Sequence, residues 1–227
     1  MTWQQEAEQL CRAVLGPELG EMPIYVVANA DAPAWLQASD CCGWTSDFLD
    51  AQLCETLSSA GKWRGRGFAT VISDTRNGRP ASPREKVCTA LHELAHHLEV
   101  LARGSTVVKR TVQELAPFLD PPSKPVDKAM IDRVIGPRPA WHKHGVAFTR
   151  ACGHVAHRAS LAGFPAALSD LGAAGRPYRL SEPQAYLFAL GDEQRACESE
   201  PLLDVLRRPA PSRFVELFER DIAKVAA

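Results

Sequence analysis

Apolar positions repeat with helical spacing near both ends of the chain. In residues 2–15, Leu10 and Val14 lie four positions apart among polar residues, and a Gly-Pro pair follows. This spacing predicts an amphipathic helix that the Gly-Pro pair ends. Residues 182–190 and 214–225 are also apolar on one face. We therefore expect helices in both parts of the chain.

Two short runs have the composition of β-strands. Residues 23–27 and 68–73 are rich in β-branched and aromatic side chains, and residues 74–80 contain the Asn-Gly and Pro signals of a turn. Between the two strands we expect a second helix over residues 45–57, with a Thr-Ser pair as its cap. Strands and helices together predict an α+β fold with a small sheet.

The clearest helix start in the sequence follows the second strand. Ser82 can cap the helix, Pro83 suits its first position, and Glu85 stands three residues after the serine. These residues form a capping box. We expect the helix to run from Pro83 to about Arg103, where Gly104 ends it.

The second half of the chain divides into three parts. Six prolines fall within an expected insertion at about residues 104–140. A further helix is expected from about Trp141 to Leu161, followed by a helical C-terminal extension at about residues 164–227. At 227 residues the chain is long enough for one good-sized core, so we treat residues 1–227 as a single domain.

Composition and charge narrow the class of protein. With 45% hydrophobic and 23% charged residues and a net charge of -1, the chain has the balance of an ordinary globular protein. We see neither a secretion signal nor a stretch of membrane-spanning length, so we expect a cytoplasmic protein without a membrane partner. The seven cysteines form no C-x-x-C pair, which excludes a zinc ribbon and favours reduced thiols over a disulfide framework.

The candidate chemistry lies on the capped helix. His92 and His96 are one helical turn apart on one face, so both imidazoles can reach one metal ion. Glu93 stands beside them, where its carboxylate can take a proton from a water on that ion. Zinc would lower the pKa of this water to about 7 and polarise a scissile carbonyl. The alternative is that surface histidines match the pattern by accident. The apolar residues around the motif favour instead a helix that is partly buried at this point.

A catalytic zinc usually has a third protein ligand, which the motif itself does not supply. Glu99 lies back on the His92 face and is one candidate. His97 points away, as do His154 and His157 on the later helix. If that helix has already begun at His144, this residue shares a face with Phe148 and could point at the metal. His142 is two positions earlier and lies about 200° around the same helix.

A His-Glu-x-x-His motif followed by a His-Gly-x-x-Phe segment resembles the SprT/Spartan-like zinc metallopeptidases. The resemblance covers roughly residues 68–103 and 141–160. It implies a zincin-like fold, zinc ligation by His92, His96 and His144, and Glu93 as the general base. The chain departs from this family in the long spacing between its two motifs and in the lack of a C-terminal zinc ribbon.

The sequence therefore predicts a zinc-dependent metallopeptidase that acts on a protein or peptide substrate. The alternative from another class is a zinc-binding scaffold or partner-recognition module without peptidase activity. SprT-like proteins often act near DNA, and a basic loop with aromatic neighbours contains Lys62, Arg64 and Arg66. These three residues are candidates for a DNA contact, although a solvated charged loop accounts for them as well.

Overall fold

The computed structural model describes residues 1–17, 22–32, 43–46, 60–62, 64, 68–76, 78–103, 144–171 and 180–226. In chain order its elements are α1 (Trp3–Leu15), β1 (Ile24–Ala28), η1 (Asn29–Asp31), β2 (Gly43–Ser46), β3 (Phe68–Ile72), β4 (Thr75–Arg76), β5 (Arg79–Pro80), α3 (Pro83–Arg103), α6 (Val146–Leu161), α7 (Pro183–Ala189), α8 (Gly191–Ala196), α9 (Leu202–Arg207) and α10 (Ser212–Ala226).

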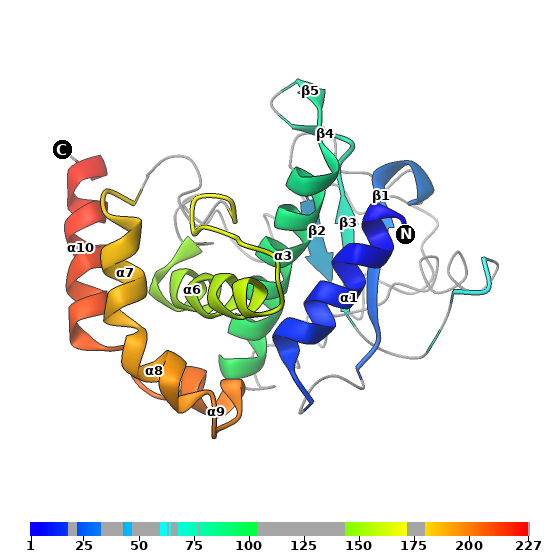
Figure 1. Ribbon diagram of the computed structural model, residues 1–227. Coiled ribbons are helices and arrows are strands. Elements are labelled where there is room, and N and C mark those ends of the chain that lie inside the picture. The colour runs from blue at the N-terminus through cyan, green and yellow to red at the C-terminus, as the bar shows by residue number, and fades with distance from the viewer. Residues whose placement is uncertain are drawn as a thin grey trace, which may run out of the picture.

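Helix α3 runs through the middle of the molecule, with the sheet and α1 on one side and α6 on the other (Figure 1). Its first turn is closed by the predicted capping box. The hydroxyl of Ser82 accepts a hydrogen bond from the amide of Glu85 at 3.3 Å, and the Glu85 carboxylate accepts one from the amide of Ser82 at 2.9 Å. Leu91, Leu94 and Leu98 are buried, so this helix forms the centre of the main hydrophobic core.

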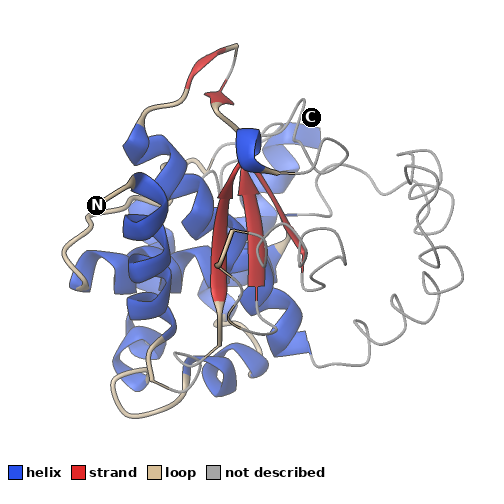
Figure 2. Cartoon of the chain, turned by 90° about the vertical axis from the view of Figure 1, so that its right-hand side faces the viewer, coloured by secondary structure: helices blue, strands red, loops and turns tan. Residues whose placement is uncertain are grey.

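The sheet has three strands in the order β1-β3-β2. Strands β1 and β3 are parallel, with Ile24 opposite Phe68, whereas β2 is antiparallel to β3, with Gly43 opposite Ile72. Helices α1 and α3 cover one face of this sheet (Figure 2). Every residue of β1 and β3 is buried, so both faces of these two strands are covered.

The structure confirms an α+β fold with a small sheet and several helices. The expected helix at 83–103 has these bounds in the structure, and the ends of the helix and the strands expected at 2–15, 23–27 and 68–73 shift by at most one residue. One element was wrong. Residues 45 and 46 belong to strand β2 and not to a helix, because Thr45 pairs with Thr70 across the ladder to β3. The rest of that expected helix lies outside the described residues, as does the expected insertion.

The start of α6 was also placed too early. The helix begins at Val146, with Gly145 as its N-cap in an extended conformation, and not near Trp141. His144 therefore precedes the regular helix, yet its ring lies beside that of Phe148 as expected, with centroids 4.6 Å apart. In the tail, α7 and α10 match the expected helices, whereas the short helices α8 and α9 had no clear apolar period to reveal them.

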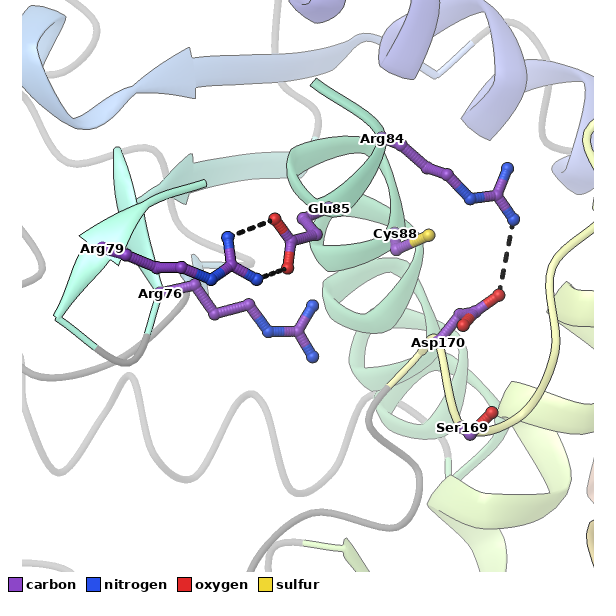
Figure 3. A pocket seen from close by; sticks show the side chains of 7 residues that line it. All are labelled: Arg76, Arg79, Arg84, Glu85, Cys88, Ser169 and Asp170. Carbon is purple, nitrogen blue, oxygen red and sulfur yellow. Dashed lines mark hydrogen bonds and ion pairs between the residues drawn. The ribbon is translucent and has the colours of Figure 1, made fainter. Parts of the chain in front are cut away.

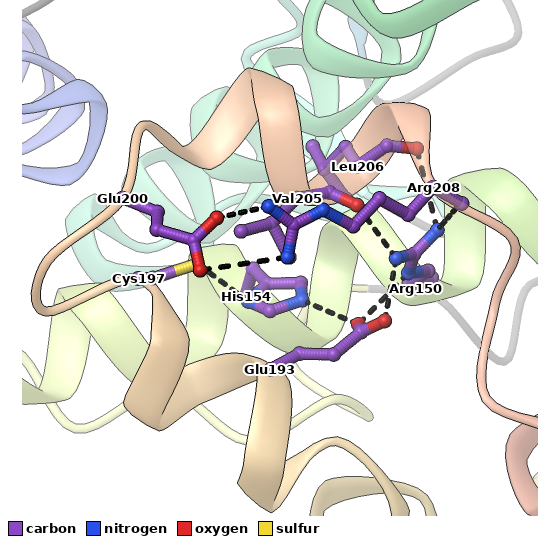
Figure 4. Close-up of polar contacts among 8 residues, drawn as sticks. All are labelled: Arg150, His154, Glu193, Cys197, Glu200, Val205, Leu206 and Arg208. Carbon is purple, nitrogen blue, oxygen red and sulfur yellow. Dashed lines mark hydrogen bonds and ion pairs between the residues drawn. The ribbon is translucent and has the colours of Figure 1, made fainter.

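A buried arginine ties α6 to the C-terminal helices (Figure 4). Arg150 is only 3% exposed and donates from Nε and Nη2 to the carboxylate of Glu193 on α8, at 2.9 and 2.5 Å. The same guanidinium donates to the carbonyls of Val205 and Arg208, at 2.8 and 2.7 Å. His154, one turn further along α6, lies 3.1 Å from Glu193 through its Nε2. This network fixes the position of α6 against α8 and α9.

Within the described residues, no helix combines the length and the apolar character needed to span a bilayer.

Candidate metal centre

Three of the predicted site residues come from the middle of α3. His92 and His96 are half-buried on one face, and Glu93 beside them is only 5% exposed. The rings of His92 and His96 meet edge to face, with centroids 5.0 Å apart. The helix is held by the sheet and α1 on one side and by α6 on the other, so the backbone under these side chains is fixed.

The side chain of His144, two residues before the start of α6, lies next to those of His92 and His96. Its Nε2 lies 3.3 Å from Nε2 of His92. One ligand atom from each of His92, His96 and His144 lies within 4.8 Å of the other two. The structure thus brings together the three histidines that the sequence named as metal ligands, from segments 48 residues apart or more.

The separation of these nitrogens suits a tetrahedral ion. Two nitrogens bound to one tetrahedral zinc at about 2.0 to 2.1 Å are roughly 3.3 Å from each other. The His92–His144 distance of 3.3 Å has this value. The ligand atom of His96 lies within 4.8 Å of the other two, so all three imidazoles face one point.

The protonation of His92 is set by the backbone. Its Nδ1 contacts the carbonyl oxygen of Leu171, which can only accept a hydrogen bond. Nδ1 therefore carries the proton, and Nε2 keeps the lone pair that a metal ligand requires. Burial, together with the neighbouring His96 and His144, lowers the pKa of His92 to about 3. The ring is consequently neutral at neutral pH, as metal ligation demands.

His96 has an aromatic ring on one face and a carboxylate near its ring edge. The ring of Phe148 stacks on it at a centroid distance of 4.1 Å and an angle of 27°. A carboxylate oxygen of Glu99 lies 3.9 Å from Nδ1 of His96. Glu99 is not in the group of three converging ligand atoms, so its geometry suits orienting His96 better than binding the ion.

Glu93 faces the same point without joining the group of three. Its Oε1 lies 3.9 Å from Nε2 of His92. Burial raises the pKa of Glu93 to about 7, against the opposing influence of His96. A carboxyl group with this pKa can take up and release a proton near neutral pH, which is the property of a general acid and base.

The remaining histidines lie away from this centre or outside the described residues. His97 is buried and packs against Phe68 at a ring distance of 4.0 Å, so it points away from the three histidines as expected. His154 bonds to Glu193, and His157 lies one turn further along α6. The rival ligand His142 falls outside the described residues.

Of the three basic residues proposed as a DNA contact, Lys62, Arg64 and Arg66, one is already engaged in contacts within the protein. The guanidinium of Arg64 donates to Glu8 at 2.9 Å and to the carbonyl of Ile24 at 2.6 Å, so it joins α1 to β1. Lys62 is exposed. Arg66 lies outside the described residues.

Sequence reasoning missed two parts of the centre. The carbonyl of Leu171 could not have been found, because any residue offers the same backbone oxygen. Phe148 was expected to share a helical face with His144, but nothing in the spacing indicated that it would stack on His96.

No family model, curated protein or solved structure matches this chain in comparisons with known proteins. Inference about activity therefore stands on the geometry of the site.

Proposed function

We propose that this chain is a zinc-dependent peptidase with a zincin-like fold, similar to the SprT-like family. In this proposal His92, His96 and His144 hold the zinc ion. Glu93 is the general base. The observation that carries the proposal is the convergence of three imidazoles beside a buried carboxylate whose pKa is raised.

The donor set favours zinc among the common metal ions. Three neutral imidazoles are typical ligands of catalytic zinc, which keeps a fourth position open for water or substrate, whereas magnesium and calcium prefer oxygen ligands. Cys152 on α6 is fully buried, and burial raises its pKa well above the usual value, so its thiol is a poor competing ligand.

The chemistry divides between the ion and the side chains. When bound, zinc supplies a Lewis acid that makes water more acidic and polarises a carbonyl. Glu93 takes a proton from the attacking water and returns it to the leaving amine of the substrate. Its burial serves this role, because a carboxylate that stayed ionised at all times could not donate that proton. His92 is kept as a neutral ligand by the carbonyl of Leu171.

The competing function is a zinc-binding scaffold without peptidase activity. A structural zinc site is normally closed by four protein ligands and needs no base beside it. The described residues offer three converging histidines and a buried carboxylate at Glu93, which suits a catalytic site better. Nothing among the described residues favours a nucleic-acid partner, so the proposed substrate is a protein or a peptide.

Replacing Glu93 with Gln tests the proposal. The amide keeps the volume of the side chain but cannot act as the base, so Glu93→Gln should bind zinc with wild-type stoichiometry and lose at least about a hundredfold in turnover. Zinc content and cleavage of casein and of the chain itself would be measured on both proteins. Equal turnover in the variant, on any substrate that the wild type cleaves, would reject the mechanism.

A further inference from the structure

A separate cavity of about 330 Å³ begins one helical turn before the histidines of α3. Its walls come from the β4–β5 hairpin, the first turns of α3 and the loop that contains Ser169 and Asp170 (Figure 3). Cys88 on its wall precedes His92 by four residues, a rise of about 6 Å along the helix. The next residue of the same loop, Leu171, contacts His92. The cavity and the metal centre thus share a helix and a loop.

Three arginines line this cavity, and two of them are neutralised. Arg79 donates to both carboxylate oxygens of Glu85, at 2.9 and 2.5 Å. Arg84 lies 3.4 Å from the carboxylate of Asp170. Figure 3 shows both pairs joined, whereas no such contact is drawn for Arg76.

Arg76 differs from the other two in burial and in partners. Arg76 is half-buried, and its guanidinium makes no hydrogen bond or ion pair with any residue that the structure describes. Its charge reaches the neighbouring residues, because it partly opposes the burial that raises the pKa of Cys88 and adds a small contribution to the burial that lowers the pKa of His92. Among the lining residues that the structure describes, one positive charge, that of Arg76, therefore has no neutralising partner.

The charge balance indicates what would fill the cavity. A guanidinium presents a planar fork of donors that matches a carboxylate, and desolvation strengthens such a pair. The hydroxyl of Ser169 on the opposite wall offers a further donor. A single negative charge would neutralise Arg76, whereas a phosphate group carries about -1.5 to -2 and would place the excess beside Glu85 and Asp170.

We propose that Arg76 binds a carboxylate group of the substrate and so selects acidic peptides. This inference rests on the proposed peptidase function. The cavity begins about 6 Å along α3 from His92. An extended peptide covers at most about 3.3 to 3.6 Å per residue, so the carboxylate that reaches Arg76 would lie roughly two or three residues from the scissile amide.

Peptide binding to the Glu93→Gln protein tests the subsite without cleavage. The probes are fluorescent, amidated octapeptides, each with a single Glu at a different position. Each has a matched control peptide with Gln at that position. A non-amidated peptide without Glu tests whether a C-terminal carboxylate is the group bound. Fluorescence anisotropy on the zinc-loaded protein should show that either Glu at one position or the free C-terminus tightens binding by about tenfold.

Variants of Arg76 then assign the preference to this side chain. In the Glu93→Gln background, Arg76→Gln should abolish the tenfold preference, and Arg76→Lys should keep part of it, because lysine retains the charge but not the fork. The control is Arg213→Gln on α10, which removes an exposed arginine far from the cavity in sequence and should leave the preference unchanged. Circular dichroism checks that every variant is folded.

The possible outcomes separate this proposal from the peptidase itself. No carboxylate preference at any position, no binding of any peptide, or a preference that survives Arg76→Gln would overturn the subsite. The comparison of Glu93→Gln with the wild type in turnover judges the peptidase independently. An Arg76-dependent preference in a protein that never hydrolyses a peptide would leave the subsite standing and reject the peptidase.

Discussion

Each histidine of the metal centre is held by a different kind of neighbour. A backbone carbonyl holds His92, the ring of Phe148 and the carboxylate of Glu99 hold His96, and the backbone before α6 positions His144. Such supporting contacts fix the tautomer and the direction of ligand lone pairs, and losing them typically costs about ten- to a hundredfold in metal affinity.

We expect His144 to be a zinc ligand and His142 not to be one. His144→Ala should lower zinc affinity by at least about a hundredfold, because two histidines on one helix leave the ion with too few protein ligands. His142→Ala should change the affinity less than about threefold. Competition with a chromophoric zinc chelator measures both. Loss of zinc from His142→Ala but not from His144→Ala would reverse the assignment.

The sequence predicted individual site residues where their positions depend only on local spacing along one helix. His92, Glu93 and His96 follow from the helical period alone. The position of His144 in space depends on how α6 packs against α3, which single-residue spacing does not encode. Arg76 could not be singled out, because its lack of a partner among the described residues depends on which carboxylates Arg79 and Arg84 contact.

Helix α6 and the residues just before it bring Phe148 and His144 to α3. On the side of α6 that faces α8 and α9, Arg150 makes the contacts that hold the helix in place. A buried ion pair that loses one partner leaves an uncompensated charge, which costs about 3 to 5 kcal/mol. Glu193 would be that charge, and the carbonyls of Val205 and Arg208 would also lose their donor.

We therefore expect Arg150→Met to destabilise the protein by about 3 to 5 kcal/mol, although methionine fills much of the same space. Urea unfolding followed by circular dichroism measures this free energy. Arg207→Met is a matched control, since the Arg207–Asp204 pair is about half exposed on both sides. Exposed pairs contribute about 0 to 1 kcal/mol. Similar losses in the two variants would show that the buried network does not hold α6.

Elements were predictable where both end signals and periodicity were present. The capping box fixed the start of α3, and the apolar face of α10 located the last helix. Strand β2 is different, because its four residues are too short to show a period and only the ladder to β3 makes them a strand. The early start expected for α6 ignored Gly145, which takes the N-cap position instead.

Acid stability concerns the molecule as a whole. Burial lowers the pKa of His154 below its usual 6.5, although the hydrogen bond and charge of Glu193 oppose this. The unfolded chain takes up a proton near pH 6.5, whereas the folded chain does so only at a lower pH. The free energy of unfolding should therefore fall as the pH drops below 6.5. Glu193 acts in the same direction at lower pH: burial raises its pKa, but hydrogen bonds from His154 and Arg150 lower it overall.

His154→Gln isolates this contribution. The variant should lose less stability than the wild type between about pH 7 and 5, because it has no imidazole to protonate on unfolding. Metal-free samples of both proteins give the comparison, since His92 then contributes equally to each. Parallel stability curves over this pH range would show that His154 is not buried in its neutral form.

X-ray absorption at the zinc edge of the zinc-loaded chain tests whether three histidines hold the ion. We expect one zinc per chain with three imidazole nitrogens and one oxygen at about 2.0 to 2.1 Å, and one imidazole fewer in His144→Ala. A sulfur ligand at about 2.3 Å, or an imidazole count that His144→Ala leaves unchanged, would contradict it.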